Sequence, residues 1–214
     1  MILNRSSKLA TLVSKWEKIS TIPMAVLGLL YLAAYSLQVL YRENSMLVYQ
    51  LEILSLVIWL VFFLDFVVRL IFSTDGWKFI KSSWLEIISL TLPFLRTLRV
   101  FRVVFALRGI KGFVKNRANA TGVYMLMLVP LTWFTGAIAV LDAEASSPDA
   151  LINNLRDALW WSLSTITTVG YGDKYPTTIE GQLVAAVLMI TGIALFSAGA
   201  GMFASWILAD KKKN

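Results

Sequence analysis

A short loop late in the chain, residues 167–173, has two glycines at alternate positions between a semi-apolar segment and the last long apolar segment. Gly170 and Gly172 allow backbone angles that other residues resist. With such angles, the carbonyl oxygens of successive residues can all point toward one axis. Non-helical backbone at membrane depth is tolerated only where it is buried in protein or lines a watery cavity. Four copies of the loop around that axis would offer rings of oxygen atoms that replace the hydration shell of a cation.

The loop is similar to the signature sequence of potassium channels, and the matching residues are Thr168, Val169, Gly170, Tyr171, Gly172 and Asp173. The resemblance implies that these residues form a selectivity filter. It also implies that potassium ions bind to the backbone carbonyl oxygens of four of them, namely Thr168, Val169, Gly170 and Tyr171. Thr168 would offer its hydroxyl oxygen as well. The structural alternative is a glycine-rich turn that only connects two apolar segments.

The segment before the loop, 155–168, has roughly fourteen residues and is too short to cross a bilayer core, so we expect a re-entrant helix. Its run from Asp157 to Trp161 resembles the pore helix of the potassium channel family. The resemblance implies that Trp160 and Trp161 support the filter as an aromatic cuff. Trp160 could donate its indole hydrogen to Asp173. The negative C-terminal end of this helix, pointed at the permeation path, would favour cations.

A second pattern consists of basic residues at every third position of an apolar segment, with one vacancy at Phe105. These predicted gating charges are Arg96, Arg99, Arg102, Arg108 and Lys111. Three residues rise about 4.5 Å along an α-helix, and an arginine inside a membrane is kept where it faces partners or water. An evenly spaced ladder lets each charge replace the one before it as the helix moves. Two alternatives remain open: an amphipathic interfacial helix, and arginines that anchor the cytoplasmic end of a span.

Acidic partners for the ladder occur in the preceding apolar segments, where Glu52 and Asp65 lie about 20 Å apart along one predicted helix. The order of four side chains resembles the charge-transfer centre of voltage-gated potassium channels: Phe62, Asp65, Arg69 and Glu86. The resemblance implies that Phe62 plugs the sensor and that Asp65 and Glu86 are inner acids. Glu52 would be the outer acid. Phe63 is an alternative plug, and these acids would otherwise only neutralise buried arginines.

Six apolar segments are available to position these groups. Their expected ranges are 22–40, 49–72, 77–92, 93–110, 121–141 and 179–208. Apolar residues make up 57% of the chain and charged residues only 15%, whereas soluble domains carry about a quarter charged residues. Pro23 suits the start of the first helix. The sequence therefore predicts an all-α membrane protein. The basic loops all fall on one side, so both termini are expected in the cytoplasm.

The charge distribution predicts three parts. Residues 1–108 would form an N-terminal tail and a four-helix voltage-sensor bundle, and residues 109–120 a cytoplasmic linker helix. Residues 121–214 would form a two-span pore domain with the re-entrant pore helix and the filter loop. Gly192 is a candidate hinge in the last span, with simple helix packing as the alternative.

Composition also narrows the function. The chain has neither cysteine nor histidine, which removes thiolate chemistry and the commonest metal ligands, and we expect no cofactor besides permeant K+. The net charge of +7 is a weak sign of nucleic-acid binding, because most basic residues lie at the ends of apolar runs. The resemblance implies a homotetrameric, voltage-gated potassium channel of the prokaryotic type in the plasma membrane, not an enzyme. The alternatives are a potassium channel not gated by voltage and a non-conducting membrane scaffold.

Overall fold

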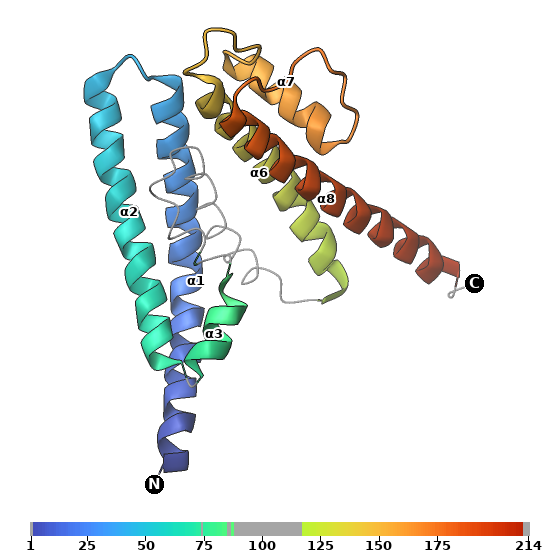
Figure 1. Cartoon of the computed structure of the whole chain (residues 1–214). Helices are drawn as coiled ribbons and strands as arrows, with labels where there is room; N and C mark the ends of the chain where they lie inside the picture. The colour runs from blue at the N-terminus through green and yellow to red at the C-terminus, as the bar shows by residue number, and fades with distance from the viewer. Residues whose placement is uncertain (1, 74, 85–86, 88–116, 212–214) are drawn as a thin grey trace. The chain divides into compact units, whose positions relative to one another are not determined.

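The computed structural model describes residues 2–73, 75–84, 87 and 117–211. Every element in this part of the chain is a helix (Figure 1). In chain order the helices are α1 (Ile2–Leu40), α2 (Ser45–Phe72), α3 (Gly76–Ser82), α6 (Arg117–Glu144), α7 (Leu155–Ile166) and α8 (Ile179–Lys211). The chain divides into two compact units, Met1–Phe113 and Val114–Asn214.

In the first unit, α1 and α2 lie side by side as an antiparallel pair joined by a short turn (Figure 1). Asn44 begins α2, because its side-chain oxygen accepts a hydrogen bond from the backbone N–H of Leu47 at 3.1 Å. Such N-caps satisfy donors that have no partner inside the helix. Large side chains between the two helices form the core, and Tyr31 of α1 and Phe62 of α2 are among those fully buried.

The prediction that the first helix begins near Pro23 is wrong, because α1 runs from Ile2 to Leu40 with this proline inside it. The helical turns before the proline have tertiary contacts of their own. Trp16 donates a hydrogen bond to Asp65 of α2, and Ser20 is buried. A proline inside a helix costs about 3 kcal/mol. Packing supplies most of the stability of helices in proteins. Here the tertiary contacts of the turns before Pro23 offset the cost of the proline, so that the helix continues on both sides of it.

In the second unit, α6 and α8 pack against each other and the short α7 lies near one end of the pair (Figure 1). Gly136 permits this close packing, since a Cβ atom there would lie 2.9 Å from a methyl carbon of Leu188. Asn154 caps α7 by accepting a hydrogen bond from the backbone N–H of Asp157 at 2.9 Å. At 12 residues, α7 is about 18 Å long. This length confirms the predicted short helix between the last two spans.

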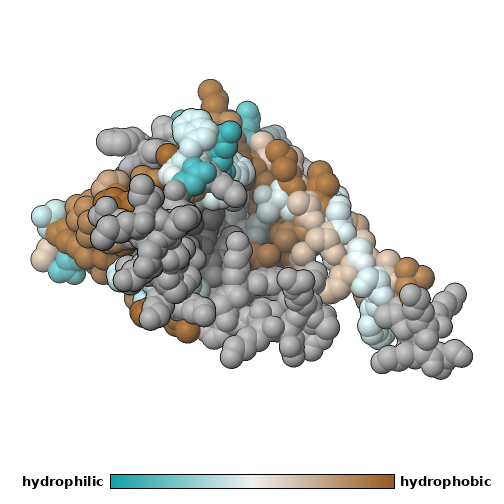
Figure 2. All heavy atoms as spheres, turned by 90° about the horizontal axis from the view of Figure 1, so that it is seen from below, coloured by the Kyte–Doolittle hydropathy of each residue, from teal (hydrophilic) through white to brown (hydrophobic). Residues whose placement is uncertain are grey.

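Among the described residues, four helical stretches are long and apolar enough to cross a membrane: Ile19–Leu40, Ser45–Phe72, Met125–Glu144 and Ile179–Leu208. Of the other two predicted spans, 77–92 lies partly and 93–110 wholly outside the described residues. Hydrophobic side chains form extended brown patches on the described surface (Figure 2). Such patches suit contact with lipid or with other subunits. The prediction of an all-α, multi-pass membrane protein is confirmed.

Candidate functional site

The loop after α7 has left-handed backbone angles at every second residue. The φ angles of Thr168, Gly170 and Gly172 are 61°, 58° and 78°. Glycine adopts such angles freely, whereas a threonine there is strained by an energy of order 1–3 kcal/mol. A Cβ atom added at either glycine would meet nothing within 4 Å. The loop therefore needs glycine for its backbone conformation and not for lack of space.

One residue of α7, Ser164, holds three consecutive amides of this loop. Its carbonyl oxygen accepts hydrogen bonds from the backbone N–H groups of Val169 and Gly170 at 3.0 and 3.1 Å. Its hydroxyl oxygen accepts the backbone N–H of Tyr171 at 3.1 Å. In a planar trans peptide, the carbonyl points opposite to the N–H of the next residue. The carbonyl oxygens of residues 168–170 therefore face away from α7, which leaves them available to a ligand.

Sequence reasoning missed Ser164, although its position on the helix just before the glycine-containing loop was a usable signal. The side of the loop that carries the carbonyl oxygens is open in the single chain. All residues of the loop, 167–173, are exposed in the single chain. An open face of this kind is incomplete as a site for an ion, because one loop can supply oxygen ligands from one direction only.

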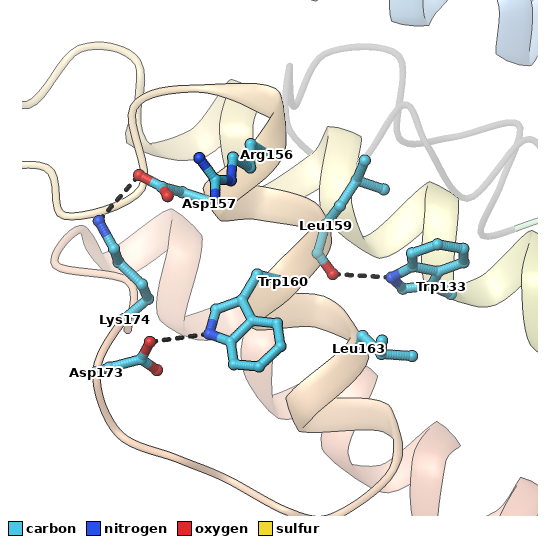
Figure 3. A pocket seen from close by; sticks show the side chains of 8 residues that line it. All are labelled: Trp133, Arg156, Asp157, Leu159, Trp160, Leu163, Asp173 and Lys174. Atoms are coloured by element: carbon cyan, nitrogen blue, oxygen red, sulfur yellow. Dashed lines mark hydrogen bonds and ion pairs between the residues drawn. The ribbon is translucent and has the colours of Figure 1, made fainter.

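The aromatic residues of α7 have two different positions. Trp160 donates its indole hydrogen to Oδ2 of Asp173 at 2.8 Å (Figure 3), the bond expected from the sequence. Its ring also stacks on Tyr171, with the ring centroids 5.1 Å apart. Trp161, in contrast, is buried within the unit. Trp160 thus contacts the loop directly, whereas Trp161 belongs to the buried face of α7.

A hollow of about 540 Å³ lies beside α7. Trp133 of α6, Leu159 and Trp160 are among its lining residues (Figure 3). Trp133 donates its indole hydrogen to the backbone oxygen of Leu159 at 2.9 Å. This bond ties α7 to the neighbouring helix α6.

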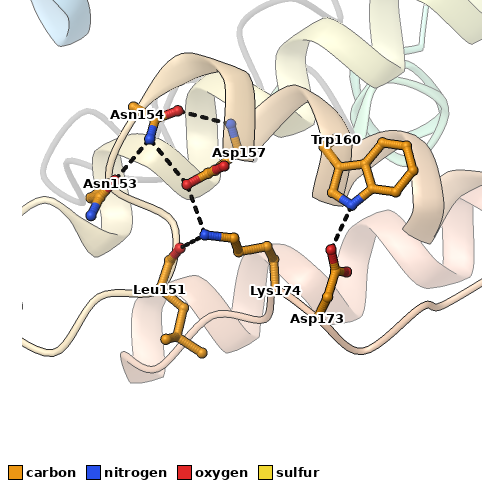
Figure 4. A network of polar contacts seen from close by, with 7 residues as sticks. All are labelled: Leu151, Asn153, Asn154, Asp157, Trp160, Asp173 and Lys174. Carbon is orange, nitrogen blue, oxygen red and sulfur yellow. Dashed lines mark hydrogen bonds and ion pairs between the residues drawn. The ribbon is translucent and has the colours of Figure 1, made fainter.

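A polar network connects the chain after the loop to the start of α7 (Figure 4). The ammonium group of Lys174 lies 2.9 Å from Oδ2 of Asp157 and donates to the backbone oxygen of Leu151 at 3.1 Å. Asn154, the residue that caps α7, also donates to Asp157, at 3.0 Å. The two ends of the segment 157–174 are therefore joined by an ion pair.

The two long helices of the second unit are joined by a buried carboxylate, Glu144, which has no exposed surface. One of its oxygens accepts the backbone N–H and the hydroxyl of Thr177 at 2.9 and 2.7 Å. The other accepts the same groups of Thr178 at 2.9 and 2.6 Å. Thr178 in turn caps α8 by accepting from the N–H of Gly181 at 3.0 Å. Sequence reasoning missed this role of Glu144.

Gly192 lies where α8 passes the end of α7. A Cβ atom there would lie 2.8 Å from the backbone oxygen of Ile166 and 3.0 Å from its Cα. The contact favours close packing as a reason for glycine at this position. The hinge role of Gly192 remains a prediction.

In the first unit, the structure distinguishes between the two adjacent phenylalanines. Phe62 has no exposed surface, whereas Phe63 is 41% exposed. Only Phe62 therefore occupies the interior of the unit, as a plug would have to. Asp65 lies one turn further along α2 and is also buried.

Asp65 is held by donors from two helices. Nε of Arg69 donates to its Oδ2 atom at 2.9 Å, and Nε1 of Trp16 donates to its Oδ1 atom at 3.0 Å. The guanidinium of Arg69 also lies over the rings of Phe66 and Phe79, at 5.9 and 5.5 Å from their centroids. Sequence reasoning did not identify Trp16, because a contact over 49 positions leaves no local signal.

The other predicted sensor residues are not brought to this site by the described part of the chain. Glu52 is exposed on α2. Six others lie outside the described residues: Glu86, Arg96, Arg99, Arg102, Arg108 and Lys111. Their roles stay predictions.

Comparison with known proteins identifies the family. Residues 123–209 match the family described as ion channel (Ion_trans_2). A voltage-gated potassium channel of Aeropyrum pernix is 30% identical over 198 residues, which cover 80% of this chain and 67% of the relative. The human voltage-gated potassium channel regulatory subunit KCNG3 is 30% identical over 128 residues, which cover 55% of this chain and 29% of that subunit. Human potassium voltage-gated channel subfamily A member 6 is 47% identical over 55 residues, or 26% of this chain and 10% of that protein. The chain therefore belongs to the voltage-gated potassium channel family.

Proposed function

We propose that the chain is one subunit of a homotetrameric voltage-gated potassium channel of the plasma membrane, with both termini in the cytoplasm. The observation that carries this proposal is the backbone of the loop after α7. Its amides at residues 169–171 bond to Ser164, so that the preceding carbonyl oxygens face the opposite side.

Potassium permeation follows from this arrangement. A potassium ion sheds its water only where rings of oxygen atoms replace the hydration shell. One loop provides a single column of oxygens on an exposed face, and four loops around an axis complete the rings. The K+ sites would lie at the carbonyl oxygens of Thr168, Val169, Gly170 and Tyr171. The bonds to Ser164 and the stacking of Trp160 on Tyr171 keep each column in place.

Voltage gating is supported by the charged cluster in the first unit. A buried carboxylate, Asp65, lies one helical turn from the buried ring of Phe62. Guanidinium groups of the predicted ladder would bind there in turn as their span moves. Moving one charge across the field is worth about 2.3 kcal/mol per 100 mV. Two or three charges in each of four subunits would give on the order of 20 kcal/mol per 100 mV, which is ample to open a gate.

Recording from the purified protein in planar bilayers tests both halves of the proposal. We expect currents carried by K+ with little Na+, and open probability that depends steeply on voltage. Gly170→Ala should abolish selective conduction, because alanine resists the φ angle of 58° at this position. Gly76→Ala is the matched control, since a Cβ there has only an ordinary contact at 4.0 Å.

Equal permeation of Na+ and K+ through the unmodified protein would contradict the proposed filter. Selective current that ignores voltage would leave the filter standing and favour a potassium channel gated in another way.

A further inference from the structure

Trp16 lies just before the apolar stretch Ile19–Leu40 of α1, yet its side chain reaches a buried acid of the neighbouring helix. Its indole nitrogen donates to Oδ1 of Asp65 at 3.0 Å. Trp16 is 43% exposed, whereas Asp65 is 3% exposed. The indole thus extends from an accessible position to a carboxylate that solvent barely contacts.

Each oxygen of Asp65 already has a donor from this chain, Trp16 at Oδ1 and Arg69 at Oδ2. An ionised carboxylate has about four acceptor positions, and a guanidinium binds it best through both oxygens at once. A guanidinium that arrives at Asp65 must therefore share or displace these donors. Arg69 itself is buried on the same helix, whereas Trp16 is a donor that reaches Asp65 from another helix.

We propose that Trp16 is a positioning residue for voltage sensing. By bonding to Asp65, its indole N–H lowers the affinity of that carboxylate for the guanidinium groups of the moving span. It thereby sets the voltage at which the sensor changes state. This inference rests on the proposed voltage gating.

The indole is uncharged, so the transmembrane field does no work on it. The slope of the open probability against voltage depends on the number of charges that cross the field. Trp16 should therefore control the midpoint of activation and leave that slope unchanged. A residue that merely stabilised the fold would alter expression or thermal stability, and would not change the midpoint while leaving the slope unchanged.

Conductance–voltage curves of Trp16→Phe in planar bilayers test the inference. Phenylalanine keeps an aromatic ring and removes the N–H donor. We expect a changed midpoint with an unchanged slope. At the original midpoint, the ratio of open to closed channels should change by about tenfold or more, as for loss of a hydrogen bond to a charged group. Trp16→His, which restores a ring N–H, should recover part of the shift.

Two controls separate this bond from general packing. Gln38→Met removes another side-chain bond between α1 and α2, from Nε2 of Gln38 to Oγ of Ser55 at 3.0 Å, and should leave the midpoint in place. In an Asp65→Asn background, Trp16→Phe should produce a smaller shift than in the unmodified channel. Coupled substitutions fail to add in this way when two residues interact directly.

The outcomes distinguish the inference from the function on which it rests. A voltage-dependent channel whose midpoint ignores Trp16→Phe, or shifts equally with Asp65→Asn present, overturns the inference alone. Potassium currents without voltage dependence overturn the proposed gating and the inference with it. The hydrogen bond can also be observed by NMR. The indole ¹⁵N–¹H resonance of Trp16 is the one that Trp16→Phe removes, and it should shift in Asp65→Asn. An unshifted resonance would also overturn the inference.

Discussion

The two units hold their functional groups in different ways. In the second unit, the loop after α7, which is the proposed filter, is held through its own backbone, with three amides bonded to Ser164. In the first unit, the carboxylate of Asp65 accepts hydrogen bonds from long side chains, among which Trp16 and Arg69 belong to the described part of the chain. Backbone groups cannot exchange partners without refolding the loop, whereas side chains can swing aside. A rigid site suits an oxygen cage of fixed size, and an exchangeable site suits a succession of arginines.

The largest expected effect comes from Glu144, the buried carboxylate that joins α6 to α8. Glu144→Ala should destabilise the second unit by several kcal/mol, because it leaves the donors of Thr177 and Thr178 without their acceptor in a buried place. Thermal unfolding of the purified protein measures this. Glu180→Gln is the control, since Glu180 is exposed in the first turn of α8. An unchanged melting temperature for Glu144→Ala would show that the rigid unit does not depend on this link.

Neutralising one basic residue of the predicted ladder tests whether the first unit controls voltage dependence separately from ion selectivity. Arg99→Gln should make the open probability less steep in voltage, because fewer charges cross the field, and should leave K+ selectivity intact. Conductance–voltage curves in planar bilayers give both quantities. Arg156→Gln removes an exposed positive charge at the start of α7 and serves as the control. An unaltered slope in Arg99→Gln would exclude Arg99 as a gating charge.

Ser164→Ala should affect conduction and leave the voltage dependence unchanged, the reverse of Arg99→Gln. It removes the acceptor for the N–H of Tyr171 but keeps the carbonyl that holds the two preceding amides. The loss of one such bond is worth about 1–2 kcal/mol, so we expect a filter that loses conduction sooner in prolonged recordings, with an unchanged voltage slope. Ser162→Ala, which removes a bond confined to α7, is the control. Equal lifetimes of current in both variants would contradict the role given to Ser164.

The smallest effect is expected for the Lys174–Asp157 pair. The side chains of the two residues are 31% and 22% exposed, and ion pairs near the surface contribute about 0–1 kcal/mol. Lys174→Met should lower the melting temperature slightly at low salt and less at high salt, since salt screens the pair. A large, salt-independent loss would mean that the bond to the oxygen of Leu151 matters more than the charge.

Much of the second unit could be predicted from the sequence because its signals are local. The alternate glycines, the short helix before them and the Trp160–Asp173 bond all lie within 20 positions of one another. The helix cap at Asn154 is equally local. Groups of this kind are constrained by backbone geometry, which neighbouring residues largely determine.

The contacts that were missed join distant parts of the chain. Glu144 meets Thr177 across 33 positions and Trp16 meets Asp65 across 49. Such pairs form only after the helices have packed, and no spacing rule within one helix predicts them. The error at Pro23 has the same origin, because contacts between helices outweighed a local preference. The structure also shows that Phe62 is buried and Phe63 is exposed. The sequence could not distinguish these two adjacent phenylalanines.

The close approach of Gly192 to Ile166 has a mechanical consequence. In the predicted hinge role of Gly192, this contact would be the pivot, and the part of α8 from Gly192 to its end at Lys211 would act as the lever. From Gly192 to Lys211 the lever arm is about 28 Å long. A tilt of about 10° would leave the filter end in place and carry the far tip of the helix sideways by about 5 Å.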